Sequence, residues 1–206
     1  MPSSRVLLFA TALGLAMLPA VCPAPAQQPQ PSRIRATIDS VDGNTLAVTA
    51  RDGTHLTLRT PDNVQVSGIV KIALSDIKAG DYIGVAAMPQ ADGSQKALSV
   101  HLFPEAMRGT AEGFRPWDLR PNSTMTNATV DQTVESNDGQ RLTLKYKDGE
   151  KIVMVTPETP IVTYVPGDRA DLKAGAKIIA LATRNEDGSL TAPRISVGKD
   201  GLTPPM

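Results

Sequence analysis

The chain has 206 residues, with 21 basic and 21 acidic side chains and a formal net charge of +0 at pH 7. A chain with this balance lacks the overall attraction to nucleic acid or to anionic lipid that a strongly basic protein has. Its single cysteine, Cys22, excludes a framework of disulfides within the chain.

Residues 1–26 have the pattern of a secretory signal peptide. Arg5 is the only charged residue there, and it precedes an apolar run that ends in small residues. We expect cleavage near Ala26, a mature chain that is periplasmic or secreted, and a disordered lead-in over residues 27–33. Two alternatives stay open. One is a membrane anchor, which the shortness of the apolar run disfavours, and the other is a lipid anchor on Cys22.

Seven Asp-Gly pairs punctuate the chain, and six of them form two matching sets. The first set begins at positions 42, 52 and 92, and the second begins at positions 138, 148 and 187. The segment 75–80 returns in similar form as 170–175. Matched features are therefore offset by 96 residues and then by 95, which predicts an internal duplication.

Alternating residues on either side of these turns predict β-hairpins. Leu46, Val48 and Ala50 alternate with the residues between them, and the Asp52-Gly53 turn follows this run. An Asp-Gly pair favours a type I′ turn, in which both central residues take positive φ. The runs 82–87 and 178–182 are apolar on both faces, which is typical of central strands. No long helix is expected.

Each copy holds enough short strands for a small sheet, and closure into a barrel protects the edges of such a sheet. We expect an all-β protein of two tandem, OB-like β-barrels related by internal duplication, although the pattern also suits another small barrel or a sandwich. Copy one is assigned to residues 34–103 and copy two to residues 127–198. A structured linker is assigned to residues 104–126, and a loose tail to residues 199–206.

The stretches Ala-Thr-Ile-Asp-Ser-Val-Asp-Gly-Asn-Thr-Leu (36–46) and Asp-Ile-Lys-Ala-Gly-Asp (76–81) resemble exported bacterial small-barrel domains of unknown function. With residues 107–110 and 115–119, the chain resembles tandem-copy alphaproteobacterial proteins of this kind, some of which are labelled metal transporter permeases. The resemblance implies export and an OB-like fold, and it supplies no catalytic residues. A permease crosses the bilayer several times, and no segment after residue 26 is apolar enough to cross it once.

Motifs for catalysis are absent from the sequence. After residue 26 there is no cysteine, no Gly-x-Ser-x-Gly elbow, no nucleotide-binding glycine pattern and no zinc-ligand spacing. His55 and His101 differ from their counterparts in the other copy and are interpreted as strand-surface residues. We expect no enzyme activity and no cofactor, with an undetected hydrolase as the alternative. The six scattered aromatic residues after residue 26 give no platform for nucleic acid.

The most unusual stretch is 104–126, which carries the only tryptophan and has no counterpart before copy one. In one interpretation it is a connector that plugs the junction of the barrels. In the other it forms a binding surface there, because pockets favour domain interfaces. The residues expected in such a surface are Arg108, Phe114, Arg115, Trp117 and Asp118.

A soft-metal site is the alternative use of the same region. Met107, Met125 and His101 are the residue types that suit monovalent copper, since thioether and imidazole are its preferred ligands. The sequence therefore predicts an exported, non-enzymatic binding protein of two small β-barrels whose partner is an unknown protein or small ligand. The alternative is a periplasmic copper-type binding protein.

Overall fold

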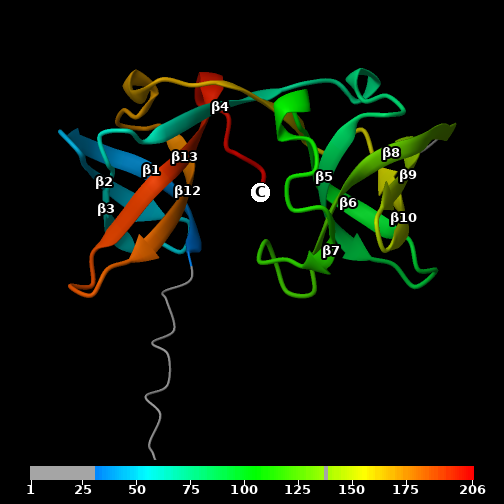
Figure 1. Cartoon of the computed structure of the whole chain (residues 1–206), viewed down its shortest axis with the longest axis horizontal. Helices are drawn as coiled ribbons and strands as arrows, with labels where there is room; N and C mark the ends of the chain where they lie inside the picture. The colour runs from blue at the N-terminus through cyan, green and yellow to red at the C-terminus, as the bar shows by residue number, and fades with distance from the viewer. Residues whose placement is uncertain (1–30, 137–138) are drawn as a thin grey trace, which may run out of the picture.

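The computed structural model describes residues 31–136 and 139–206, and this part of the chain is all-β, as predicted (Figure 1). The expected signal peptide, Cys22 and most of the expected lead-in lie outside the described residues. The strands are β1 (Ser32–Asp42), β2 (Thr45–Ala50), β3 (His55–Arg59), β4 (Gln65–Lys71), β5 (Tyr82–Pro89), β6 (Gln95–Leu102), β7 (Gly113–Pro116), β8 (Thr124–Ser136), β9 (Gly139–Tyr146), β10 (Gly149–Val155), β11 (Ile161–Pro166), β12 (Lys177–Arg184) and β13 (Leu190–Gly198). Short 3-10 turns are η1 (Leu74–Asp76), η2 (Glu105–Met107), η3 (Arg169–Asp171) and η4 (Lys199–Gly201).

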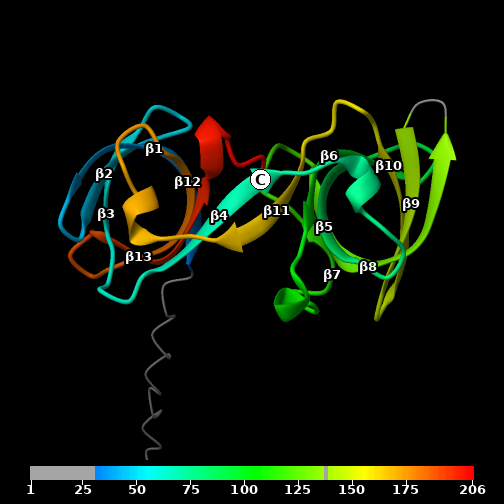
Figure 2. The same cartoon turned by 90° about the horizontal axis from the view of Figure 1, so that it is seen from above.

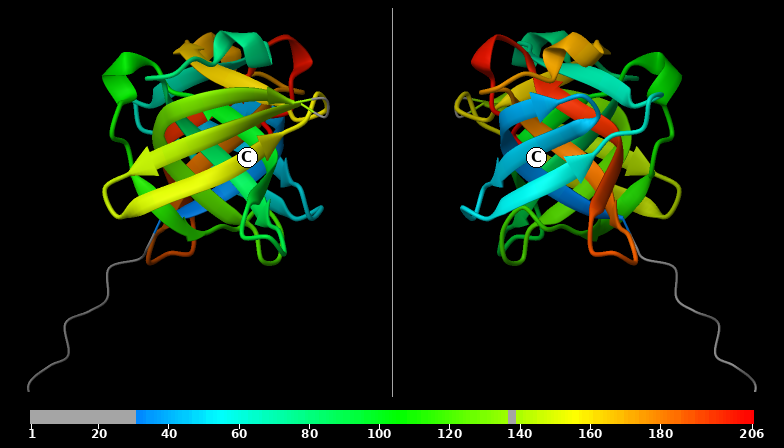
Figure 3. Two further views of the ribbon diagram at one scale, coloured as in Figure 1. Left: turned by 90° about the vertical axis from the view of Figure 1, so that its right-hand side faces the viewer. Right: turned by 90° about the vertical axis from the view of Figure 1, so that its left-hand side faces the viewer.

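The strands close two rings of hydrogen-bonded neighbours. In the first barrel the order is β1-β2-β3-β13-β12, and the β12–β1 pairing completes the circle. In the second barrel the order is β5-β6-β10-β9-β8, completed by β8–β5. Figure 3 views the molecule from the side of each barrel in turn. The prediction of a small closed barrel is confirmed.

The barrels do not follow the repeat boundaries predicted from the sequence. Strands β1–β3 of the first half close with β12 and β13 of the second half, and β8–β10 close with β5 and β6. The assignment of residues 34–103 and 127–198 to one barrel each is therefore wrong, because each half supplies three strands to one barrel and two to the other. The hydrophobic pattern permits this exchange because equivalent strands of the two halves offer similar apolar faces.

Two strands carry the chain from one barrel to the other. β4 leaves the first barrel and β11 leaves the second, and they pair antiparallel from Ser67↔Pro166 to Lys71↔Val162 (Figure 2). β4 also runs parallel to β13, and β11 runs parallel to β6, so the bridge is continuous with both rings. The two barrels are thus held by backbone hydrogen bonds as well as by covalent connections.

The hairpin turns are of a different type from the one predicted. At Asp52-Gly53 only Gly53 has positive φ, +87°, and its N–H donates to the Ala50 carbonyl over 2.9 Å. The Ala50 N–H in turn donates to the Thr54 carbonyl over 2.8 Å, which makes a three-residue loop with a glycine bulge. The Asp52 carboxylate accepts from the Thr54 N–H at 3.0 Å, and this contact favours the aspartate at a negative φ.

Each barrel buries its own apolar core. Members of the first core include Ile38, Leu58 and Ile195, and members of the second include Val100, Leu142 and Val153. A third, smaller cluster joins Ala86, Met125 and Met206, with Trp117 and Leu119 packed against it.

The segment 199–206, expected to be a loose tail, packs instead into the space between the barrels, where Figure 1 marks the C-terminus. Met206 is 7% exposed. Lys199 fixes the start of the segment by donating to the Asp171 carboxylate at 2.6 Å.

Candidate ligand-binding site between the barrels

A cavity of about 560 Å³ lies between the two barrels. The first barrel lines it with residues of β1, β12 and β13, the second with residues of β6 and β8, and the bridging strands β4 and β11 contribute as well. Its volume is within the ~300–1,000 Å³ that is usual for small-molecule pockets. The cavity is thus lined by both barrels and by the bridge between them.

One wall of the cavity is a row of stacked rings. The rings of His101 and Tyr164 lie 5.5 Å apart between centroids, and those of Phe103 and Tyr164 lie 5.8 Å apart and within 18° of parallel. Tyr82 backs Phe103 at 5.5 Å. The row depends on Gly84, because a Cβ there would lie 2.9 Å from the Phe103 ring. β6 and β11 are parallel neighbours in which His101 pairs with Val162, so Tyr164, two residues further along the same face of β11, lies diagonally across from His101.

His101 is buried, in contrast to the strand-surface position predicted for it. Its neighbour Val100 points into the core of the second barrel, so the alternation of the strand turns His101 outward, toward the cavity. Only 1% of its surface is exposed, and neither ring nitrogen has a hydrogen-bond partner among the described residues. Burial lowers the pKa of His101 to about 3, so the imidazole is neutral at physiological pH. His55, by contrast, is on the outer surface of the first barrel, as expected.

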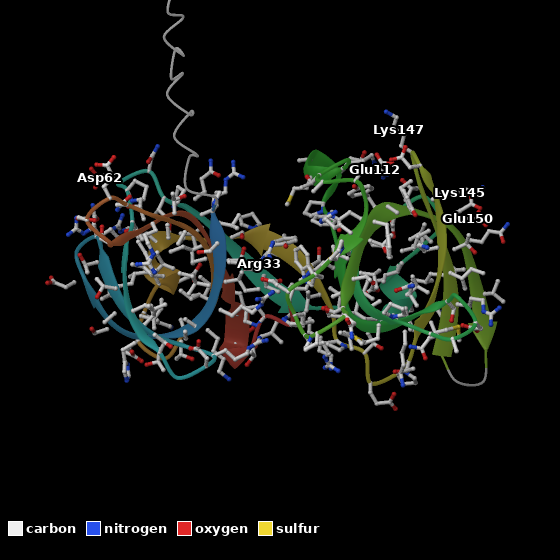
Figure 4. All side chains as sticks on the ribbon, turned by 90° about the horizontal axis from the view of Figure 1, so that it is seen from below. Arg33, Asp62, Glu112, Lys145, Lys147 and Glu150 are labelled. Atoms are coloured by element: carbon white, nitrogen blue, oxygen red, sulfur yellow. The ribbon has the colours of Figure 1, made fainter. Side chains whose placement is uncertain are left out.

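Trp117 follows β7 and lies against two arginines. The guanidinium carbon of Arg33 is 4.0 Å from the indole centroid, and that of Arg115 is 5.5 Å from it. The indole Nε1 is buried and has no hydrogen-bond partner in the described residues. Arg33 was assigned to the lead-in before copy one, but it lies in β1. Figure 4 shows Arg33 in the region where the two barrels meet.

Asp118 ties the linker to the first barrel. The two terminal guanidinium nitrogens of Arg35 donate to its carboxylate, at 2.7 and 3.1 Å, and Arg33 donates to it at 3.2 Å. Partial burial acts against ionisation of Asp118, but the hydrogen bond and charge of Arg35, with the charge of Arg33, lower its pKa overall. Asp118 is therefore a structural clamp beside the cavity and is not among the residues that line it.

The charged side chains that line the cavity are all cationic in the part of the chain that the structure describes. They are Arg33, Arg115 and Arg194. Arg33 shares the Asp118 carboxylate with Arg35, whereas Arg115 donates only to the Ala111 carbonyl, at 2.7 Å, and no described carboxylate pairs with Arg194. Burial and the nearby charge of Arg33 lower the pKa of Arg115. Two guanidinium groups at the cavity thus lack a counter-ion among the described residues.

The structure brings together only some of the residues expected at the junction. Arg115 and Trp117 line the cavity, whereas Arg108 and Phe114 do not. Arg108 points away and donates to Glu105 at 2.7 and 2.8 Å. Phe114 is 40% exposed on the outside of the second barrel, under the Lys151 ammonium at 4.5 Å.

The three residues of the alternative metal site line this same cavity. Met107, Met125 and His101 all contribute to its wall. Within residues 31–136 and 139–206, no three His, Cys, Asp or Glu side chains come together as a metal-binding cluster. Any metal ion in the cavity would therefore depend on thioether ligands and one imidazole.

Several lining residues were missed at the level of sequence. Tyr164 and Asn127 come from strands that looked purely structural, and Arg194 comes from an alternating strand. One signal was present: the run 178–182 is apolar on both faces, and its outer residues Ile179 and Leu181 line the cavity. A strand that is apolar on both faces typically has its outer face, as well as its inner face, turned away from solvent.

No helix in the described part of the chain is long and apolar enough to cross a membrane. Comparisons with protein-family models, with curated proteins and with solved structures find no match to this chain.

Proposed function

We propose that the protein is a non-enzymatic binding protein that holds a small ligand in the cavity between its barrels. The observation that carries the proposal is one apolar cavity, of ligand size, lined by both barrels and by the strands that bridge them. Residues of this wall also hold polar atoms that lack a hydrogen-bond partner among the described residues and have almost no exposed surface: the ring nitrogens of His101, the indole Nε1 of Trp117 and the Oδ1 of Asn127. Buried polar groups without partners are unfavourable, so a ligand that reaches them after a small rotation of these side chains gains affinity.

The described residues form no catalytic triad at the cavity, and this supports binding over catalysis. His101 is the histidine at the cavity. No carboxylate accepts a hydrogen bond from its ring to orient it, and no hydroxyl is bonded to it that it could activate. A general base acts through a hydrogen bond to the group that it deprotonates and needs a pKa near the working pH. The pKa of His101 is lowered far below neutral pH, so this residue is suited to a neutral wall and poorly suited to general-base catalysis.

Calorimetric titration with three naphthalene derivatives tests the proposal: 2-naphthoate, 2-naphthol and 2-naphthylmethylammonium. At least one should bind with 1:1 stoichiometry and be recovered unchanged. Ser67→Phe places a ring in the cavity wall and should weaken binding by about tenfold or more. Thr129→Phe alters a half-buried strand residue that does not line the cavity, and it should bind as the unmodified protein does. Failure of all three probes, or equal binding by the two variants, would refute the proposal.

A soft-metal binder is the second candidate, favoured by the convergence of Met107, Met125 and His101 on one cavity. The two guanidinium groups near Trp117 count against it, because they repel a cation. Titration with silver(I), followed by the fluorescence of Trp117, separates the candidates. A stoichiometric change that Met125→Leu abolishes would support the metal site, and no change would eliminate it.

A further inference from the structure

We infer that the ligand is a small organic anion with an apolar body, which pairs its negative group with Arg115 and Arg194. This inference rests on the proposed function and adds the chemical class of the ligand. Three features of the cavity carry it: the apolar wall, the uncompensated charge and the neutral polar groups in the interior.

The wall selects an apolar body. Residues from both barrels and from the bridge line the cavity, and many of their side chains are aliphatic, aromatic or thioether. These include Ile69, Phe103, Met107, Trp117, Met125, Tyr164, Ile179, Leu181 and Met206. Burial of apolar surface against such a wall is favourable by roughly 25 cal/mol per Å². A small hydrophilic ion, such as inorganic phosphate, would gain nothing from these contacts.

The charge selects an anion. Arg115 is half-buried, has no carboxylate partner among the described residues, and lies close enough to Arg33 to be repelled by it. Removing a guanidinium from water without a counter-ion is unfavourable, and an incoming carboxylate offsets that cost. Arg194 adds a second cation from β13, on the side of the first barrel. A planar guanidinium binds a carboxylate through two parallel hydrogen bonds, which favours a planar anionic group.

The interior polar groups exclude a cation as the ligand. The described lining contains no carboxylate, and the carboxylate of Asp118, which binds the lining residue Arg33, is also engaged by Arg35. His101 is neutral, so it adds no negative charge to the wall. An ammonium group in this cavity would meet two unpaired arginines and no opposite charge.

The three naphthalene derivatives introduced above share one apolar body and differ in the charge of the polar group. We expect 2-naphthoate to bind about tenfold more tightly than 2-naphthol, and 2-naphthylmethylammonium to bind most weakly. Tenfold corresponds to about 1.4 kcal/mol. The preference for naphthoate over naphthol should also fall as salt is added, because salt screens the partly exposed ion pairs between the carboxylate and the two arginines.

Arginine variants locate the effect. Arg115→Gln and Arg194→Gln should each reduce the preference of the cavity for naphthoate over naphthol several-fold. Arg194 is exposed, so its variant keeps the test valid if Arg115→Gln impairs folding. Arg141→Gln, an exposed arginine of β9 that does not line the cavity, is the matched control and should keep the full preference.

The outcomes distinguish failure of the anion assignment from failure of the binding function. Equal binding of naphthoate and naphthol, or a naphthoate preference that survives both variants, would overturn the assignment of an anion and leave the binding function standing. If none of the probes binds, the binding function itself falls. Decanoate in place of naphthoate tests the body: comparable affinity shows that any apolar chain is accepted, and loss of binding restricts the class to aromatic anions.

Discussion

Replacement of His101 by phenylalanine should change how the stability of the protein depends on pH. Unfolded, this histidine binds a proton below its ordinary pKa of 6.5, whereas folded it does so only near pH 3. Its folded pKa is depressed, so its contribution is complete above pH 6.5 and is lost as the pH falls through the window between these two values. Each pKa unit corresponds to about 1.36 kcal/mol, so lowering the pH from about 7.5 to about 4.5 should cost roughly 3 kcal/mol.

The phenylalanine variant lacks this titration and keeps a ring to stack on Tyr164. Near pH 7.5 it should be at least as stable as the unmodified protein, because it removes two buried nitrogens that lack partners, each costing about 1–3 kcal/mol. Aspartates with lowered pKa, such as Asp52 and Asp187, also lose stability in acid, but they do so equally in both proteins.

Urea unfolding, followed by Trp117 fluorescence across that pH range, measures the difference between the two proteins. We expect the unmodified protein to lose roughly 3 kcal/mol more than His101→Phe. The exposed His55, replaced by glutamine, is the control and should leave the pH profile of the unmodified protein intact. Parallel profiles for the unmodified protein and His101→Phe would refute the buried, neutral histidine.

Three further changes test other parts of the structure by their free energy of unfolding. Gly84→Ala should cost about 1–3 kcal/mol, because its Cβ would lie 2.8 Å from Asn127 and 2.9 Å from Phe103; an unchanged stability would contradict the close packing of the ring row. Gly53→Ala should cost about 1 kcal/mol through its φ of +87° alone, since nothing lies within 4 Å of its Cβ; a larger loss would point to a different turn. Asp118→Asn should cost below about 1 kcal/mol, because the pair with Arg33 and Arg35 is partly exposed, and a loss of several kcal/mol would mean that the clamp is buried.

The sequence predicted the local structure well because local structure depends on local patterns. Alternation and Asp-Gly spacing located the hairpins, and the all-β class followed from them. The partner of each strand was not predictable. Ile178 of β12 occupies the place in the predicted repeat that Ile83 holds in β5, so β1 could pair with either strand on hydrophobic pattern alone. The pairing that forms depends on how β4 and β11 connect the two barrels. Local sequence patterns do not determine that connection.

The candidate site was predicted in part for a similar reason. Composition marked the linker as unusual, and Arg115, Trp117, Met107 and Met125 do reach the cavity. Arg33 and Met206 were missed because they lie in Pro-rich or terminal segments, which composition alone assigns to disorder. Arg108 and Phe114 were included because they share the linker, but their side chains face the outer surface.

The exchange of strands between the halves is the central claim, and cross-strand nuclear Overhauser effects test it most directly. The structure pairs Ala36 with Ile178 across β1 and β12, and Ala128 with Ile83 across β8 and β5. We predict strong backbone contacts between the protons of these two pairs. Contacts between Ala36 and Ile83, with none between Ala36 and Ile178, would show that each half closes its own barrel and would contradict the account.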